Sequence, residues 1–319
     1  MSELWTLDQM KSQAGKRILI TGANSGVGYS AAVELARHGA VVIMACRDRG
    51  RGAASLVKLH ADASGPDSAA SSAELVELDL ASLDSVKRVA EEELARGTGL
   101  DCLINNAGVM APPKRLETKD GFEVQFGTNV LGHYALTCRL MPALVRAGRA
   151  AQSRVVTLSS IAHKRGKLNF DDLQAKQHYV PMDAYAQSKL ADLMFTFDLE
   201  RRLVAAGLPV ESLAVHPGVA KTNLFKVGDG TGLAGVAQSI FQHSLGVIFN
   251  TELGGAIPTL FAATSEKAQG GAYYGSQGLQ EMRGGDVGLA QIAPQAKDAE
   301  AQTRLWQVCE TLTGVGLPA

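Results

Sequence analysis

Residues 17–28 read RILITGANSGVG, a short apolar run that leads directly into a turn with three glycines. The apolar run predicts a buried strand, and helical spacing of apolar residues begins at Gly26 and continues to His38. Glycines in such a turn allow a tight reversal and let the backbone approach a pyrophosphate at the positive end of the helix. A purely structural turn is the alternative, but the flanking strand and helix favour the first unit of a dinucleotide-binding fold.

The same alternation of apolar runs and helical periods continues along the chain. Strand cores that are apolar on both faces and separated by helices indicate a parallel sheet covered on both sides. We therefore expect one doubly wound Rossmann-type α/β domain over residues 1–319, and the amphipathic stretch 298–313 suits a packing helix. Further strands are expected at 41–45, 75–78, 100–104, 155–158, 210–215 and 272–274, and helices at 52–60, 83–94, 123–145 and 183–206.

Three segments depart from this alternation and are interpreted as insertions, at about 61–72, 161–182 and 226–250. Residues 230–251 contain no Asp, Glu, Lys or Arg, but scattered Gln, Ser, His and Asn side chains argue against a transmembrane span. Long loops in compact domains are usually functional, so we expect 226–250 to form an apolar substrate lid. A dimer surface or contact with a lipid interface is the alternative.

The composition excludes several classes of partner. Lys plus Arg is 31 and Asp plus Glu is 32, so a net charge of −1 offers no broad attraction for nucleic acid. The four cysteines form no CxxC pair and the histidines have no HxxxH spacing, so neither a disulfide framework nor a metal site is expected. The N-terminus has no apolar signal region, which favours a reduced, cytoplasmic protein.

The end of the second expected strand bears on the choice of nucleotide. Cys46 is followed by Arg47, Asp48 and Arg49, with Arg51 beyond. A guanidinium group can donate two parallel hydrogen bonds to a 2′-phosphate, so Arg47 favours NADP(H), with Ser25 as a helper. An acidic residue here would instead accept from a ribose hydroxyl, so Asp48 keeps NAD open, and a solvated basic loop is a further alternative.

A second group of polar residues lies where a doubly wound sheet binds ligands. Tyr185 and Lys189 are four residues apart on a predicted helix and share a face, so the ammonium group would stabilise a phenolate. Ser160 ends the fifth expected strand and could hydrogen-bond a substrate carbonyl. Asn129, inside the preceding helix, is either a tolerated polar residue or a partner of Lys189 or water in a proton relay.

Together these motifs resemble the short-chain dehydrogenase/reductase family, and within it the retinol dehydrogenase-like and WW-domain-oxidoreductase-like branch. The similarity to the branch is strongest at residues 45–47, 128–133 and 216–218. The family motifs are matched, in order, by Thr21 to Gly28, Asp79, Asn105 to Gly108, Asn129, Ser160, Tyr185, Lys189, Pro217, Gly218 and Thr222.

The resemblance implies a role for each matched residue. Tyr185 would be the general acid/base and Ser160 would position the carbonyl. Lys189 would stabilise the Tyr185 phenolate and hold the nicotinamide ribose, and Asn129 would complete the proton relay. The implied cofactor contacts are Gly22, Asn24, Ser25, Gly26, Val27, Gly28, Arg47, Asp79, Leu80, Asn106, Ala107, Gly108, Tyr185, Lys189, Pro217, Gly218, Val219 and Thr222.

The resulting hypothesis is an NADP(H)-dependent oxidoreductase. It would transfer a hydride between the nicotinamide and a bulky hydrophobic ketone, aldehyde or alcohol. The alternative is a non-catalytic NADP-binding sensor or scaffold with the same fold. Members of the family often pair through helices, so the resemblance is also compatible with a homodimer or homotetramer.

Overall fold

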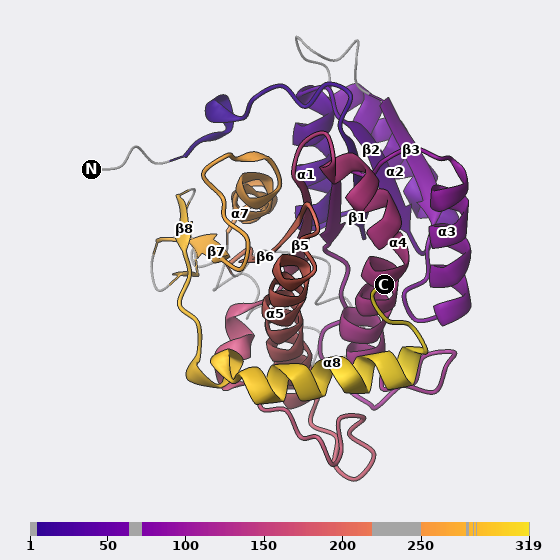
Figure 1. Cartoon of the computed structure of the whole chain (residues 1–319), viewed down its shortest axis with the longest axis vertical. Helices are drawn as coiled ribbons and strands as arrows, with labels where there is room; N and C mark the ends of the chain where they lie inside the picture. Colours follow the sequence, from indigo (N-terminus) through magenta and orange to yellow (C-terminus); the bar gives the residue numbers. More distant parts are fainter. Residues whose placement is uncertain are drawn as a thin grey trace, which may run out of the picture.

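The apolar runs of the sequence form one eight-stranded sheet in a computed structural model, which describes residues 5–63, 72–218, 250–278, 281, 282, 284 and 286–318 (Figure 1). The sheet order is β3-β2-β1-β4-β5-β6-β7-β8, and neighbouring strands are parallel except for β8, which is antiparallel to β7. The strands are β1 (Arg17–Thr21), β2 (Val41–Cys46), β3 (Ser72–Glu77), β4 (Cys102–Asn105), β5 (Ser153–Leu158), β6 (Val210–His216), β7 (Tyr273–Ser276) and β8 (Val287–Leu289).

Helices cover both faces of the sheet, as the sequence predicts. Figure 1 shows α5 lying along the sheet and α8 crossing the lower end of α5, while α7 lies on the other side beside β7. The helices are α1 (Gly26–Arg37), α2 (Arg49–Asp62), α3 (Leu83–Ala95), α4 (Gly132–Gly148), α5 (Pro181–Ala205), α7 (Glu252–Thr264) and α8 (Ala299–Thr313), with the shorter η1 (Leu7–Gln9), η2 (Phe126–Leu131), η3 (Ile161–Arg165) and η6 (Pro294–Lys297).

Two hydrophobic cores lie on opposite faces of the sheet because strand side chains alternate. Leu19 and Ile43 belong to the core beneath α3, α4, α5 and α8, whereas Ile20 and Met44 belong to the core beneath α1 and α7. All four side chains are fully buried. The continuous apolar runs of the strands follow from this burial on both faces, which confirms the predicted doubly wound fold.

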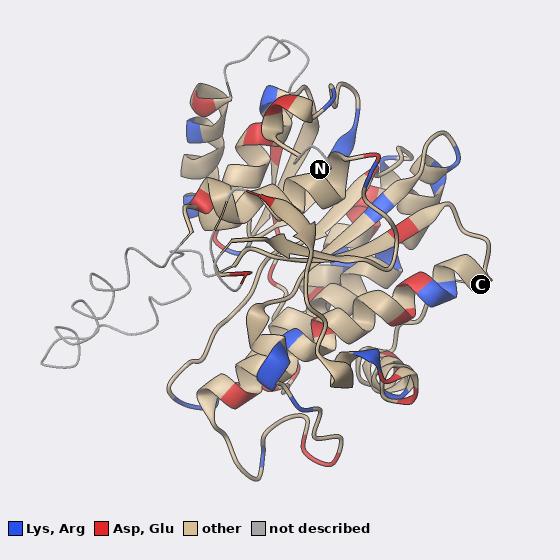
Figure 2. Cartoon of the chain, turned by 90° about the vertical axis from the view of Figure 1, so that its left-hand side faces the viewer, with Lys and Arg blue, Asp and Glu red and all other residues tan. Residues whose placement is uncertain are grey.

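Charged residues are confined mainly to the outer elements. Figure 2 shows Lys and Arg interspersed with Asp and Glu over the helices and loops of the face in view, in keeping with the net charge of −1. Among the described residues, no helix is both long enough and apolar enough to cross a membrane.

The structure corrects the sequence interpretation in several places. Helix α7 was not predicted, because Gly254, Gly255 and Pro258 interrupt its helical pattern. The sheet is not wholly parallel, since β8 adds an antiparallel edge. The expected loop 61–72 is shorter at both ends, because α2 continues to Asp62 and β3 begins at Ser72. Residues 226–249 of the expected lid lie outside the described residues.

Trp306 is the largest of the buried side chains through which helix α8 packs against the domain. Trp306 is buried and lies between Tyr134 of α4, with ring centroids 4.9 Å apart, and Phe195 of α5, on which it stacks at 5.9 Å. The guanidinium of Arg202 lies 4.3 Å from the centre of its ring. The predicted packing role of this amphipathic helix is therefore confirmed.

Replacing Trp306 with alanine should lower the free energy of unfolding by about 3–5 kcal/mol, because it leaves a cavity between three helices. Urea denaturation followed by circular dichroism measures the loss. Gln307→Ala, on the exposed side of the same helix, is the matched control and should change stability by less than about 0.5 kcal/mol. Equal effects of the two substitutions would contradict the packing described.

Candidate active site

A cleft of about 1300 Å³ opens at the carboxyl ends of β1, β4 and β5. The strand order reverses direction between β1 and β4, and open α/β sheets bind ligands at such a switch point. Asn129 does not line the cleft, and Val219 and Thr222 lie outside the described residues. The predicted site residues that do line it are Gly22, Asn24, Ser25, Gly26, Val27, Gly28, Arg47, Asp79, Leu80, Asn106, Ala107, Gly108, Ser160, Tyr185, Lys189, Pro217 and Gly218.

The buried Thr21 side chain joins the two strand ends at the switch point. Its hydroxyl oxygen accepts hydrogen bonds from the backbone N–H groups of Asn106 and Ala107, both at 2.9 Å. The Asn106 side-chain amide donates in return to the Thr21 carbonyl at 2.7 Å. The sequence motif includes Thr21, but its role in holding β1 against β4 was not predicted.

His133 continues this network toward η2. Its Nδ1 lies 2.8 Å from the Asn129 carbonyl oxygen, which can only accept, so Nδ1 carries the proton. The other ring nitrogen, Nε2, lies 2.9 Å from the Thr21 hydroxyl and accepts a hydrogen bond from it. His133 is buried and neutral, and it connects the glycine turn to the helix that bears Asn129.

The glycine turn has the shape that a dinucleotide diphosphate requires. Gly22 has a φ of +67°, and a Cβ on Gly28 would lie 2.8 Å from the Gly22 carbonyl oxygen and against the Asn106 amide. Ser25 begins α1 without a side-chain capping bond, and the first turn of α1 carries no acidic residue. The first N–H groups of α1 are thus open to an anion in the cleft.

At the end of β2, the acidic and basic side chains have different environments. Asp48 accepts from the Arg51 backbone N–H at 2.9 Å and from Arg51 Nε at 3.0 Å. These bonds cap α2 and hold the pKa of Asp48 below its usual value. Arg47 lines the cleft, is exposed and has no hydrogen-bond partner among the described residues.

Two hydroxyl groups on the wall of the cleft keep their protons available. The Ser160 hydroxyl accepts from the Ala162 N–H at 3.2 Å and has no acceptor of its own in the described part of the chain. Tyr185 is buried except at the cleft, packs against Ala162 and Met110, and its hydroxyl bonds to no described residue. Ser159, by contrast, donates to the Lys189 carbonyl at 2.7 Å and is not available.

The ammonium group of Lys189 is fixed from two sides. It donates to the Leu158 carbonyl at 2.9 Å and to Asp192 Oδ2 at 2.8 Å. Burial favours the neutral amine, but the charges of Asp192 and Tyr185 outweigh it and raise the pKa of Lys189 above its usual value. Burial likewise raises the pKa of Asp192 to about 6, against the attraction of Lys189. Sequence reasoning missed Asp192.

Asn129 lies in η2, a π-helical turn, which is a rare element often found at functional sites. Its amide donates to the Val109 carbonyl and to the Ser188 hydroxyl, both at 3.0 Å, and accepts from the Val109 N–H at 2.8 Å. Asn129 therefore makes no direct hydrogen bond to Lys189 among the described residues, and its role as a partner of water in a proton relay stays a prediction. The two side chains instead flank Gly108, whose added Cβ would approach both.

Part of the cleft wall is apolar, whereas the sequence led us to expect apolar substrate contacts only from the lid. Leu116 and Met182 are 51% and 39% exposed although both are large hydrophobic residues, and both line the cleft. The apolar stretch that follows the Asn105–Gly108 motif was the available signal. Other apolar side chains that line the cleft include Met110, Pro112, Val124, Ile161, Ala162 and Met282.

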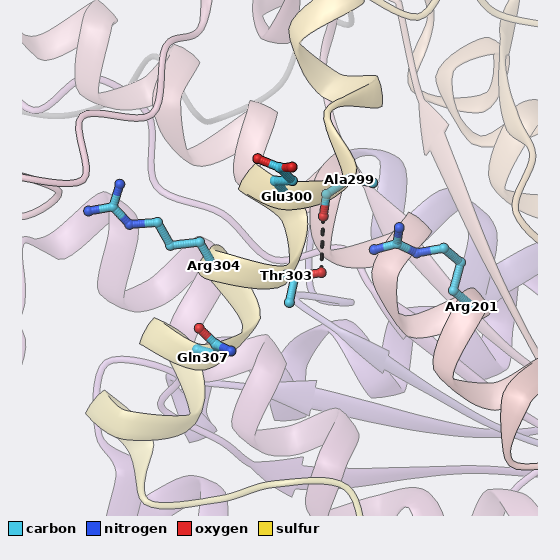
Figure 3. A pocket seen from close by; sticks show the side chains of 6 residues that line it. All are labelled: Arg201, Ala299, Glu300, Thr303, Arg304 and Gln307. Atoms are coloured by element: carbon cyan, nitrogen blue, oxygen red, sulfur yellow. Dashed lines mark hydrogen bonds between the residues drawn. The ribbon is translucent and has the colours of Figure 1, made fainter.

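A second, smaller hollow between α5 and α8 lacks convergent polar groups. Figure 3 shows that Arg201 and Arg304 lie on opposite sides of the start of α8, where the Thr303 hydroxyl donates to the Ala299 carbonyl. Arg304 covers the Phe170 ring at 4.2 Å, and Arg201 pairs with Asp198. The first contact joins α8 to the loop that contains Phe170, and the second is an ion pair within α5. Within the described residues, no group of three or more His, Cys, Asp or Glu side chains could hold a metal ion.

Comparison with known proteins agrees with this geometry. Residues 16–229 match the family model for short chain dehydrogenases. The chain belongs to the short-chain dehydrogenase/reductase family. It is therefore an oxidoreductase with a nicotinamide cofactor, and the predicted family is confirmed.

The relatives place the chain in the retinol dehydrogenase-like branch. It is 40% identical to retinol dehydrogenase 14 of Mus musculus over 94% of this chain and 86% of the relative, and 39% identical to polyprenol dehydrogenase of Mus musculus over 95% and 85%. A crystal structure of an uncharacterized protein from Mycobacterium paratuberculosis is 40% identical, covers 99% of this chain and 100% of that chain, and has a TM-score of 0.78.

Neutral His133 should make the fold sensitive to acid. Burial lowers the pKa of His133 from 6.5 to about 3, so the unfolded chain binds the proton more tightly than the folded one. The contribution of His133 to the free energy of unfolding is complete above the pKa that His133 has in the unfolded chain. It is lost, by up to about 1.4 kcal/mol per pH unit, as the pH falls toward 3. His133→Asn keeps a donor for the Asn129 carbonyl but does not titrate.

Urea unfolding at a series of pH values between about 7 and about 4.5 tests this linkage. Below about pH 6, His133→Asn should reduce the slope of the free energy of unfolding against pH by an amount that corresponds to nearly one proton taken up on unfolding. The same substitution at the exposed His178, His178→Asn, is the matched control, because it changes a histidine that folding does not bury. A His133→Asn slope equal to that of the parent would contradict the burial of a neutral imidazole.

Proposed function

We propose that the protein is an NADP(H)-dependent oxidoreductase that interconverts a bulky hydrophobic alcohol and the corresponding aldehyde or ketone. One observation carries the proposal. Ser160, Tyr185 and Lys189 line a single cleft with the glycine turn, and the two hydroxyl groups have no acceptor among the described residues. A carbonyl oxygen in this cleft would satisfy both donors.

Each of the three side chains has a distinct task in this reaction. NADP(H), when bound, supplies or accepts the hydride. Ser160 donates a hydrogen bond that polarises and orients the carbonyl, and Tyr185 gives its proton to the oxygen during reduction. Lys189, a buried ammonium group electrostatically coupled to Tyr185, stabilises the phenolate that results. In alcohol oxidation the same groups act in reverse.

Replacing Tyr185 with phenylalanine should lower kcat for carbonyl reduction by at least about 100-fold, because the proton donor is lost while the ring remains. Initial rates with NADPH measure this, and nucleotide affinity should change little. Tyr29→Phe removes a hydroxyl that bonds only Asp62 and Lys58, away from the cleft, and is the control. A Tyr185→Phe protein with the kcat of the parent would exclude this mechanism.

The preference for NADP(H) is supported by the end of β2. Asp48 is occupied by its two bonds to Arg51, so it is poorly placed to accept from a ribose hydroxyl. Arg47 is exposed at the cleft and unpaired among the described residues, which leaves its guanidinium for a 2′-phosphate. The Ser25 side chain, free of a capping bond, is a second donor for this phosphate.

Removing the Arg47 guanidinium should therefore discriminate between the two nucleotides. Arg47→Ala should lower kcat/KM for NADPH by roughly 10- to 100-fold, the value of a charge-assisted hydrogen bond to phosphate, and leave kcat/KM for NADH nearly unchanged. Arg49→Ala is the matched control, because it removes a neighbouring positive charge from a residue that does not line the cleft. Equal losses with both nucleotides, or equal kcat/KM for NADH and NADPH in the parent protein, would reject the assignment.

The apolar part of the cleft wall supports the proposal of a hydrophobic substrate. Leu116 and Met182 expose large apolar surfaces in the same cleft, and apolar side chains grouped in one cleft favour an apolar ligand. Two relatives are named for retinol and polyprenol, both long apolar alcohols. We further propose a reducing compartment such as the cytoplasm, since all four cysteines are buried free thiols.

A further inference from the structure

One turn beyond Lys189 on α5, a carboxylate group is buried beneath the cleft. Asp192 is 2% exposed, and its Oδ2 accepts from Lys189 Nζ at 2.8 Å. Lys189 is itself 5% exposed. A buried ion pair of this kind is a poor source of stability, because desolvation offsets most of the attraction between the charges. Its presence beside the reacting groups calls for another explanation.

The geometry of the ammonium group suggests what Asp192 contributes. An ammonium group has three N–H donors. The Leu158 carbonyl and Asp192 occupy two of them, so the third is left for the cleft that Lys189 lines. The carboxylate also adds a negative charge behind the positive one, which weakens the field that Lys189 exerts on Tyr185.

We propose that Asp192 is a positioning residue for the reaction, which orients the Lys189 ammonium group and sets the pH at which Tyr185 exchanges its proton. This inference rests on the proposed function of the site. It adds a fourth side chain, outside the cleft, to the group formed by Ser160, Tyr185 and Lys189. Asp192 does not line the cleft, so it acts through its bond to Lys189 and through the field of its charge, without touching the reacting atoms.

Few other titratable groups face this pair. From the η2–α4 side, His133 senses the charge of Lys189, and burial keeps its pKa at about 3. From α8, Cys309 senses Asp192, and burial holds its pKa above the usual range. From β7, Tyr273 senses the charge of Tyr185, and burial holds its pKa well above the usual value. All three remain neutral at the pH of a kinetic measurement near neutrality. Lys164 and Arg165 also line the cleft, but substitutions at Asp192 leave both in place. Asp192, Lys189 and Tyr185 are therefore the groups whose charges determine the response.

The direction of the effect follows from the charges. Asp192→Asn keeps the size of the side chain and an oxygen acceptor for Lys189, but removes the negative charge. The field of Lys189 on Tyr185 is then uncompensated, and direct repulsion between Asp192 and a phenolate also disappears. Both changes favour the phenolate, so alcohol oxidation should reach its full rate at a lower pH.

The test is the pH dependence of kcat/KM for alcohol oxidation with NADP⁺, measured on the full chain. In this profile the acidic limb is the range in which kcat/KM rises with pH. Asp192→Asn should move the acidic limb to lower pH by at least about half a unit, as expected for a charge lost a few ångströms behind Lys189. Asp192→Ser, a second variant that also lacks the charge, should move it in the same direction. A residue that only supports the fold would change kcat or stability without moving the limb.

Asp198 on the same helix is the matched control. It is also a buried carboxylate, but it pairs with Arg201 and Arg202. Asp198→Asn should leave the limb in place. An unmoved limb in the Asp192 variants would overturn the inference, as would failure of both variants to fold while Asp198→Asn folds. Absence of turnover in the parent protein would instead refute the proposed function itself.

Discussion

The site depends on one buried hydroxyl group, that of Thr21, which joins the carboxyl end of β1 to the residues that follow β4. It accepts from two backbone N–H groups of the β4 end and donates to His133, so all its hydrogen-bonding capacity is used. Without this hydroxyl the Ala107 N–H and the buried Nε2 of His133 would lose their hydrogen-bond partner, at a cost of about 1–3 kcal/mol. Because His133 also holds the Asn129 carbonyl, the nucleotide turn and the π-helical turn are positioned by the same contact. Tyr185 and Lys189 of α5 face the cleft that this arrangement leaves open.

Much of the fold and site could be predicted because the relevant signals are local. Continuous apolar runs such as residues 17–20 identify strands buried on both faces, and glycines at residues 22–28 identify a turn that no other residue fits. Spacing of four residues places Tyr185 and Lys189 on one face of α5. These patterns need only neighbouring residues for their interpretation. Of the predicted site residues that the structure describes, only Asn129 lies away from the cleft wall.

The parts that could not be predicted arise from contacts between distant segments. Helix α7 forms despite Gly254, Gly255 and Pro258 because Ile257 and Phe261 pack into the core beside α1. In the sequence, Asp192 is one more polar residue in a helix, and only the fold buries it beside Lys189. The role of His133 likewise depends on its hydrogen bond to Thr21, which lies more than a hundred residues earlier in the sequence. Propensity and periodicity carry no information about such pairings.

The central claim is that this cleft transfers a hydride between NADP(H) and a bulky apolar carbonyl or alcohol. The most direct test follows the absorbance of the reduced nicotinamide while the purified protein is offered NADPH or NADH with a panel of long apolar aldehydes, ketones and alcohols. The account predicts turnover with apolar members of the panel and a kcat/KM for NADPH at least about tenfold above that for NADH. Tight binding of NADPH without turnover of any member would contradict it and indicate a non-catalytic nucleotide-binding protein.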